Sequence, residues 1–92
     1  MSTTADIPNY EDMISALNQF SQKIFETSGQ MLSAGSTCAS QTNDEGIGRA
    51  NESLQKLQKP FGEITSEAKR IAGQLMQILE KLREAERESR SF

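Results

Sequence analysis

The chain has 92 residues, of which 35% are hydrophobic and 25% charged, with a formal net charge of −3. A chain of this size forms one domain at most and buries little more than half of its surface, so we expect another chain to help stabilise it. Histidine is absent and cysteine occurs once, which excludes a Cys₂His₂ zinc site, a Ser–His–Asp triad and an internal disulfide. The composition therefore predicts a protein without catalytic activity, metal or cofactor.

Two further classes of function have little support in the sequence. No apolar run reaches the roughly 18 residues that a membrane helix needs, and residues 1–6 lack the features of a secretory signal peptide. The basic residues of the second half are interspersed with acidic ones and have no aromatic platform beside them, unlike a nucleic-acid-binding surface. We therefore expect no membrane insertion, no Sec export and no nucleic-acid partner.

A heptad pattern of apolar or small residues begins at Tyr10. Its members are Tyr10, Met13, Leu17, Phe20, Ile24, Thr27, Met31, Ala34 and Cys38. Such a pattern predicts a helix that packs against another helix along one seam, with Cys38 as a small buried group. Asn9 is a suitable N-cap, and Glu11 and Asp12 follow it at the positive end of the helix dipole. We therefore expect a helix over residues 9–39.

Residues 40–46 interrupt the pattern with side chains that bond their own backbone, and end in a glycine. Gly46 and Gly48 give the backbone freedom to reverse its direction, so we place the turn of the chain here.

A second heptad pattern follows the turn. Its members are Ile47, Ala50, Leu54, Leu57, Phe61, Ile64, Ala68, Ile71, Leu75, Ile78, Leu82 and Ala85. The pattern predicts a helix over residues 47–90. Pro60 cannot donate a backbone hydrogen bond, so we expect a kink near it, and not a break, because the heptad phase continues across it.

Together the two patterns predict a single all-α domain over residues 1–92, an antiparallel two-helix hairpin of the coiled-coil kind. Residues 1–46 contain six acidic residues and one basic residue, whereas residues 47–92 contain seven acidic and nine basic ones. The two arms therefore attract each other weakly, and we expect Lys23 and Glu67 to face one another at the edge of the seam.

A second stripe on each arm has almost no charge. Its residues are Ile14, Asn18, Ser21, Phe25, Ser28, Leu32, Gly35 and Ala39 on the first arm, and Gln58, Gly62, Thr65, Lys69, Ala72, Met76 and Leu79 on the second. We expect this stripe to bind a partner and complete a four-helix bundle, although single exposed apolar residues are also common on protein surfaces. The predicted partner-binding residues are Ile14, Phe25, Leu32, Gly35, Ala72, Met76 and Leu79, together with Leu82 and Phe92 as anchors in the charged segment that follows.

A helical hairpin with Gly46-Ile47-Gly48 at its turn, no Sec signal and a partner-seeking face resembles the WXG-type small proteins of bacterial type VII secretion. The likeness is greatest to their Trp-lacking relatives that accompany LXG toxins. The resemblance implies a bacterial cytoplasmic protein, or one exported by the type VII route. It also implies a helical partner: an LXG toxin's N-terminal region, a sister hairpin or a second copy. The alternatives are a self-assembling structural hairpin, like a type III needle subunit, and a generic coiled-coil adaptor.

Overall fold

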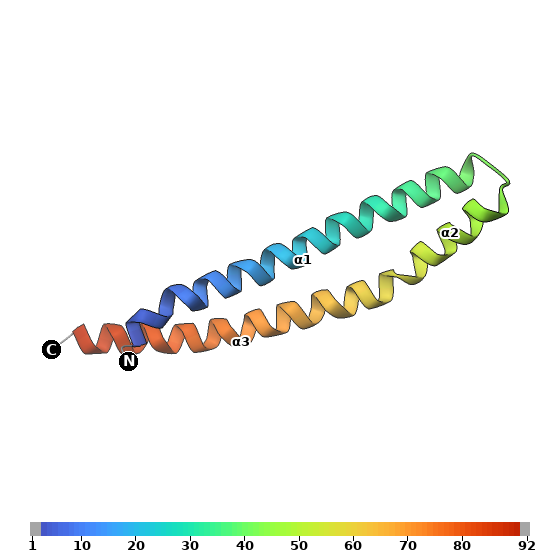
Figure 1. Ribbon diagram of the computed structural model, residues 1–92. Helices are drawn as coiled ribbons and strands as arrows, with labels where there is room; N and C mark the ends of the chain where they lie inside the picture. The colour runs from blue at the N-terminus through green and yellow to red at the C-terminus, as the bar shows by residue number, and fades with distance from the viewer. Residues whose placement is uncertain (1–2, 91–92) are drawn as a thin grey trace.

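The computed structural model describes residues 3–90, and side chains from residue 6. Its three helices are α1 (Thr3–Ser40), α2 (Glu45–Lys56) and α3 (Gln58–Arg90). The helix α1 runs antiparallel to α2 and α3, which follow one another along the second arm (Figure 1). The molecule is a rod with extents of 74 × 18 × 15 Å. The predicted all-α hairpin is therefore confirmed, whereas a four-helix bundle would need a second chain.

The first helix is longer than the heptad pattern predicts. It begins at Thr3 and continues through Pro8, so that Asn9, the expected N-cap, lies inside the helix. Pro8 removes one backbone hydrogen bond from this extension, and Asp6 supplies a negative charge in the first turn.

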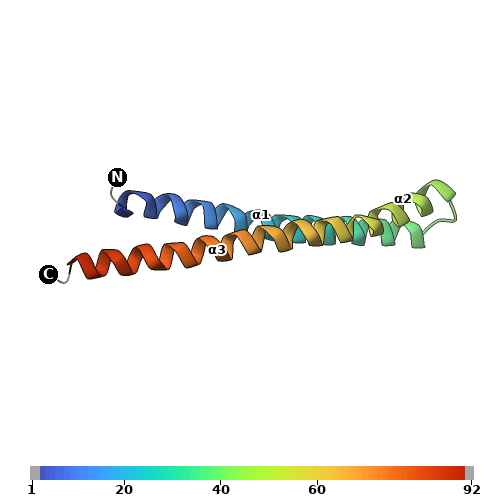
Figure 2. The same cartoon turned by 90° about the horizontal axis from the view of Figure 1, so that it is seen from below.

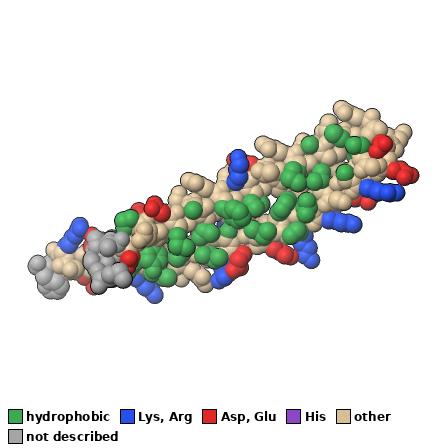
Figure 3. Space-filling model, in the orientation of Figure 1, with side chains coloured by type: hydrophobic (Ala, Val, Ile, Leu, Met, Phe, Trp, Pro, Cys, Tyr) green, Lys and Arg blue, Asp and Glu red, His purple; other side chains and the backbone are tan. Residues whose placement is uncertain are grey.

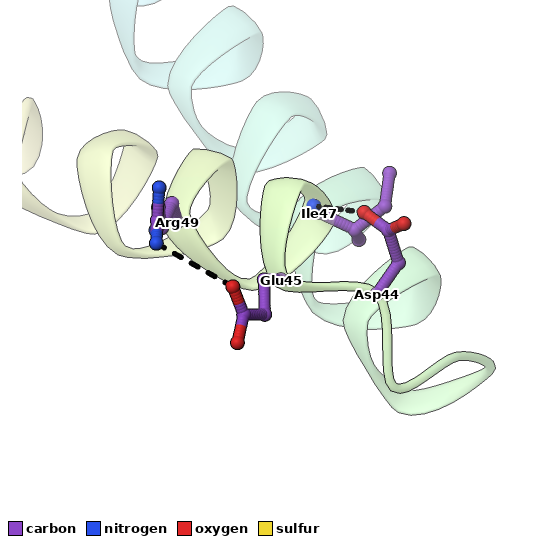
Figure 4. Close-up of polar contacts among 4 residues, drawn as sticks. All are labelled: Asp44, Glu45, Ile47 and Arg49. Carbon is purple, nitrogen blue, oxygen red and sulfur yellow. Dashed lines mark hydrogen bonds and ion pairs between the residues drawn. The ribbon is translucent and has the colours of Figure 1, made fainter.

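Asp44 starts the second arm. Its backbone is extended (φ −64°, ψ 126°), and its Oδ1 accepts a hydrogen bond from the Ile47 N–H at 3.0 Å (Figure 4). This is the geometry of an N-cap, and Glu45 adds an ion pair to Arg49 at 3.5 Å in the following turn. Gly46 is in the first turn of α2, and no described glycine has a positive φ. The reversal is thus made before Gly46 and does not use the conformational freedom expected of it.

We predict that Asp44→Ala lowers the free energy of unfolding by about 0.5–2 kcal/mol, because the Ile47 N–H loses its acceptor. Asp44→Asn keeps an acceptor oxygen and should lose much less. Urea unfolding followed by circular dichroism measures both, and equal losses in the two variants would contradict the capping role.

The second arm is interrupted at Leu57, three residues before the proline. The Leu57 N–H donates to the carbonyls of Ser53 (3.3 Å) and Leu54 (3.2 Å), and its own carbonyl accepts from Phe61 N–H at 3.1 Å. Pro60 therefore lies in the first turn of α3, where a missing N–H has little cost. The arm changes direction at this point (Figures 1 and 2). The heptad phase continues across it, since Leu54 and Phe61 are half-buried and Ala68 is buried.

The contact between the arms, which we call the inner seam, differs from the predicted seam on α1. Ile14, Ser21 and Ser28 are buried, whereas Met13 and Phe20, which were expected to be buried, are 55% and 46% exposed. In the seam of α1, the predicted column that contains Met13 and Phe20 is therefore replaced by the column one residue later, which contains Ile14 and Ser21.

The same shift occurs on the second arm. Ala68, Ala72 and Leu79 are buried, whereas Ile64 and Ile78 are 44% and 43% exposed. Of these buried residues only Ala68 belongs to the predicted seam; Ala72 and Leu79 belong to the stripe that was expected to face a partner. Both arms have thus rotated toward the same side.

One column of the inner seam on α1 contains the small residues Ser21, Ser28 and Gly35, which let side chains of the other arm lie close to the α1 backbone. A Cβ atom added to Gly35 would lie 2.7 Å from Asn51 Oδ1 and 2.9 Å from Leu54 Cδ1. The buried hydroxyls keep their hydrogen bonds, since Ser21 donates to the Leu17 carbonyl at 3.0 Å and Ser28 donates to the side chain of Gln58 on the other arm. Close approach and the hydrogen bonds of these two serines favour this seam over the predicted one, although the buried Asn51 Oδ1 has no hydrogen-bond partner in it.

We predict that Gly35→Leu lowers the free energy of unfolding by about 1–3 kcal/mol, because the new side chain overfills the seam. Gly29→Leu is the matched control, since nothing lies within 4 Å of its added Cβ. It should instead stabilise the helix by up to about 1 kcal/mol. Thermal unfolding of the two variants tests the close approach, and a stabilised Gly35→Leu protein would disprove it.

Candidate protein-binding face

One side of the hairpin carries a continuous line of apolar residues, which we call the outer apolar face. Each of its members stands one residue before an inner-seam residue, and they form one column on each arm. The members are Met13, Phe20, Thr27 and Ala34 on α1, and Ala50, Leu57, Ile64, Ile71 and Ile78 on α2 and α3. In an antiparallel pair, equivalent positions on the two helices lie on the same side, so the two columns are neighbours. Figure 3 shows a band of hydrophobic side chains along the rod between charged margins.

Most large side chains of this face are exposed, and Ile71 is half-buried. Leu57, Ile64 and Ile78 on one arm and Met13 and Phe20 on the other are all exposed. Complete burial of one such side chain stabilises a protein by about 1.5–3 kcal/mol. Covering several of these side chains with a partner would therefore favour association by several kcal/mol. Exposed apolar patches of this kind mark interaction sites.

Two apolar hollows indent the face. One, of about 200 Å³, lies between Phe20 and Thr27 of α1 and Phe61 of α3. The other, of about 240 Å³, lies near the turn, between Ala34 of α1 and Ile47 of α2. Each hollow bridges the two arms, so a side chain from a partner would contact both helices at once.

Charged residues stand at the margins of the face. The predicted pairing of Lys23 with Glu67 is replaced by a pairing of Glu67 with Arg70, one turn further along α3. The hydrogen bond from the Arg70 guanidinium lowers the pKa of the Glu67 carboxyl. The pair therefore contributes at neutral pH, and its contribution is lost as the pH falls through that lowered pKa. Both side chains are more than half exposed, so this contribution is small.

The opposite side of the hairpin is polar by comparison. It has a hollow of about 530 Å³ lined by Asn18, Gln22 and Met76, and an ion pair between Arg83 and Glu11 at 3.2 Å that crosses from α3 to α1. A second hollow on this side, of about 760 Å³, is lined by Phe25, Leu32 and Gln58, so some apolar residues also gather here.

The predicted partner-binding residues that the structure describes divide into two groups. Phe25, which is 74% exposed, and Met76 are exposed on the polar side, and Leu32 is half-buried there. The others that the structure describes belong to the inner seam. They are Ile14, Ala72 and Leu79, which are buried, and Gly35 and Leu82, which are half-buried.

The seam residues of this set need a corrected interpretation: while the hairpin is closed, the other arm covers them and a partner cannot. Phe92 lies outside the described residues. Cys38, expected in the seam, is exposed.

Comparisons with known proteins give no relative: no family model, no curated protein and no solved structure matches this chain. Over the described residues, no helix combines the length and the hydrophobicity that crossing a membrane requires. Within the same residues, no three His, Cys, Asp or Glu side chains are grouped so that they could hold a metal ion. The outer apolar face is thus the feature of this molecule that suggests a function.

Proposed function

We propose that this chain is a noncatalytic helical binding module, and that its outer apolar face packs against another helical chain to form a four-helix bundle. The observation that supports this most is the exposure of Met13, Phe20, Leu57, Ile64 and Ile78 along one side of the hairpin. A protein that folded to function alone would bury such side chains first.

The shape of the face favours a helical partner. Its residues recur at every seventh position on both arms, which is the spacing that helices in bundles use to interdigitate their side chains. The face is also long and narrow, on a rod whose length is 74 Å. One or two helices laid along it would cover both columns.

We further propose that the module acts in type VII secretion, as a partner or substrate, with an LXG toxin's N-terminal region or a sister hairpin among its binding partners. The support is the resemblance described above: a hairpin of two long helices, with Gly46 and Gly48 beside the turn. In this role the chain would cover the helices of the toxin and help present them to the export machinery.

We predict that Phe20→Asp and Ile64→Asp each weaken the association of this chain with its helical partner at least tenfold. In both variants a charge replaces an apolar contact that is worth more than about 1.4 kcal/mol. Phe25→Asp makes the same chemical change on the polar side, and should leave association unchanged. Sedimentation equilibrium gives the affinities, and circular dichroism checks that all three variants remain helical. A defect in association confined to Phe25→Asp would place the binding surface on the polar side of the hairpin and contradict the proposal.

The secretion role has a separate test. Co-expression with the N-terminal helical region of an LXG toxin encoded beside this chain should give a complex of fixed stoichiometry by light scattering, and Ile64→Asp should abolish it. Open-ended polymers that grow with concentration would instead support the structural-subunit alternative.

A further inference from the structure

We propose that a second copy of this chain occupies the outer apolar face, with the turns of the two hairpins at the same end and a two-fold axis along the rod. This inference rests on the proposed function, since it uses the same face, and it names the partner and its orientation. In this arrangement α1 of each copy lies over α3 of the other.

The two columns of the face fit this arrangement. Contacts across the seam set the level of the arms: Ile14 and Leu79 line one hollow, and Ser28 bonds Gln58. In the antiparallel pair, a residue of α1 therefore lies at the same height along the rod as the second-arm residue equally far from the turn, to within about one helical turn. The resulting pairs are Met13 with Ile78, Phe20 with Ile71, Thr27 with Ile64, and Ala34 with Leu57.

A two-fold axis along the rod turns each of these pairs into a layer of four side chains, two from each copy. In the layers near the turn, small residues on α1 face large ones on the second arm of the other copy: Thr27 faces Ile64, and Ala34 faces Leu57. Alternation of small and large side chains across facing positions fills a core without voids. The two layers nearest the turn are thus complementary in size, whereas the other two layers bring large apolar side chains together.

Charge selects the same orientation. With six acidic residues and one basic residue in residues 1–46 and an excess of two basic residues in residues 47–92, one arm is negative and the other positive. When the turns lie at the same end, each negative arm lies over a positive one, and Lys23 comes to the level of Glu67 of the other copy. When the turns lie at opposite ends, the negative arm of one copy lies over the negative arm of the other, and the two arms repel each other.

The area of the face is close to that of a standard interface. At 1.5 Å per residue, the second-arm column from Ala50 to Ile78 is about 42 Å long, which is roughly half of the 74 Å rod. Over the 18 Å width of the rod, this length gives an area close to the roughly 800 Å² per partner of a standard stable interface.

A spin label in the turn tests the orientation. The full chain carrying Cys38→Ser and Asn43→Cys is labelled, and the distance between the two labels in the dimer is measured by pulsed electron paramagnetic resonance. We expect a separation comparable to the 18 Å width of the rod. A separation close to its 74 Å length would overturn the proposed orientation.

A matched pair of charge reversals tests the role of the margin. Lys23→Glu should raise the dimer dissociation constant several-fold, because it faces Glu67 of the other copy. Lys69→Glu alters net charge equally but lies on the polar side, beside Asn18 and Phe25, and should leave the constant unchanged. Equal effects of the two reversals would overturn the charge pairing.

Failure of this inference can be told apart from failure of the proposed function. A chain that stays monomeric at high concentration but binds a toxin helical region through Ile64 would overturn the second copy and keep the function. A monomer that binds no helical chain would overturn both. A dimer that survives Phe20→Asp and Ile64→Asp unchanged would show that its interface is elsewhere, and would also overturn both.

Discussion

The close approach of the two arms is the constraint on which the rest of this structure depends. A side chain at Gly35 would displace the side-chain ends of Asn51 and Leu54 on α2, and serines occupy two further positions of the same column. Small residues bring the helix axes together, and the large apolar residues one position earlier are then displaced to one side. The exposed apolar face is therefore a direct result of how the hairpin closes, because the seam and the face are set by the same rotation of the helices.

The sequence was sufficient to predict the helical class, the antiparallel hairpin and the position of the turn. It was not sufficient to predict which residues the arms bury. Heptad spacing is satisfied equally by two adjacent columns, one containing Met13 and Phe20 and the other Ile14 and Ser21, and hydrophobicity alone favours the first. The choice depends on size and on hydrogen bonds across the seam, such as that of Ser28 with Gln58, which appear only when the arms are paired.

The stripe expected to bind a partner and the outer apolar face do not coincide. Ile64, which was assigned to the seam, is 44% exposed, whereas Leu79 of the expected stripe is 2% exposed and Phe25 of the same stripe is 74% exposed. A signal for the burial of Leu79 was present in the sequence, because a regular column runs through Asn51, Gln58 and Thr65 into Ala72. Those polar residues disfavoured its choice as a core, yet Gln58 and Thr65 are satisfied by bonds within the hairpin.

The interruption at Leu57 gives the turn end a character of its own. The helix α2 has 12 residues, a length at which an isolated helix is marginal in water, and the break separates it from the long helix α3. Its helicity therefore depends on α1 and on the Asp44 cap. Amide hydrogen exchange should consequently be fastest near the turn and slowest in the middle of α3, so that the rod melts from one tip and leaves its central portion paired longest.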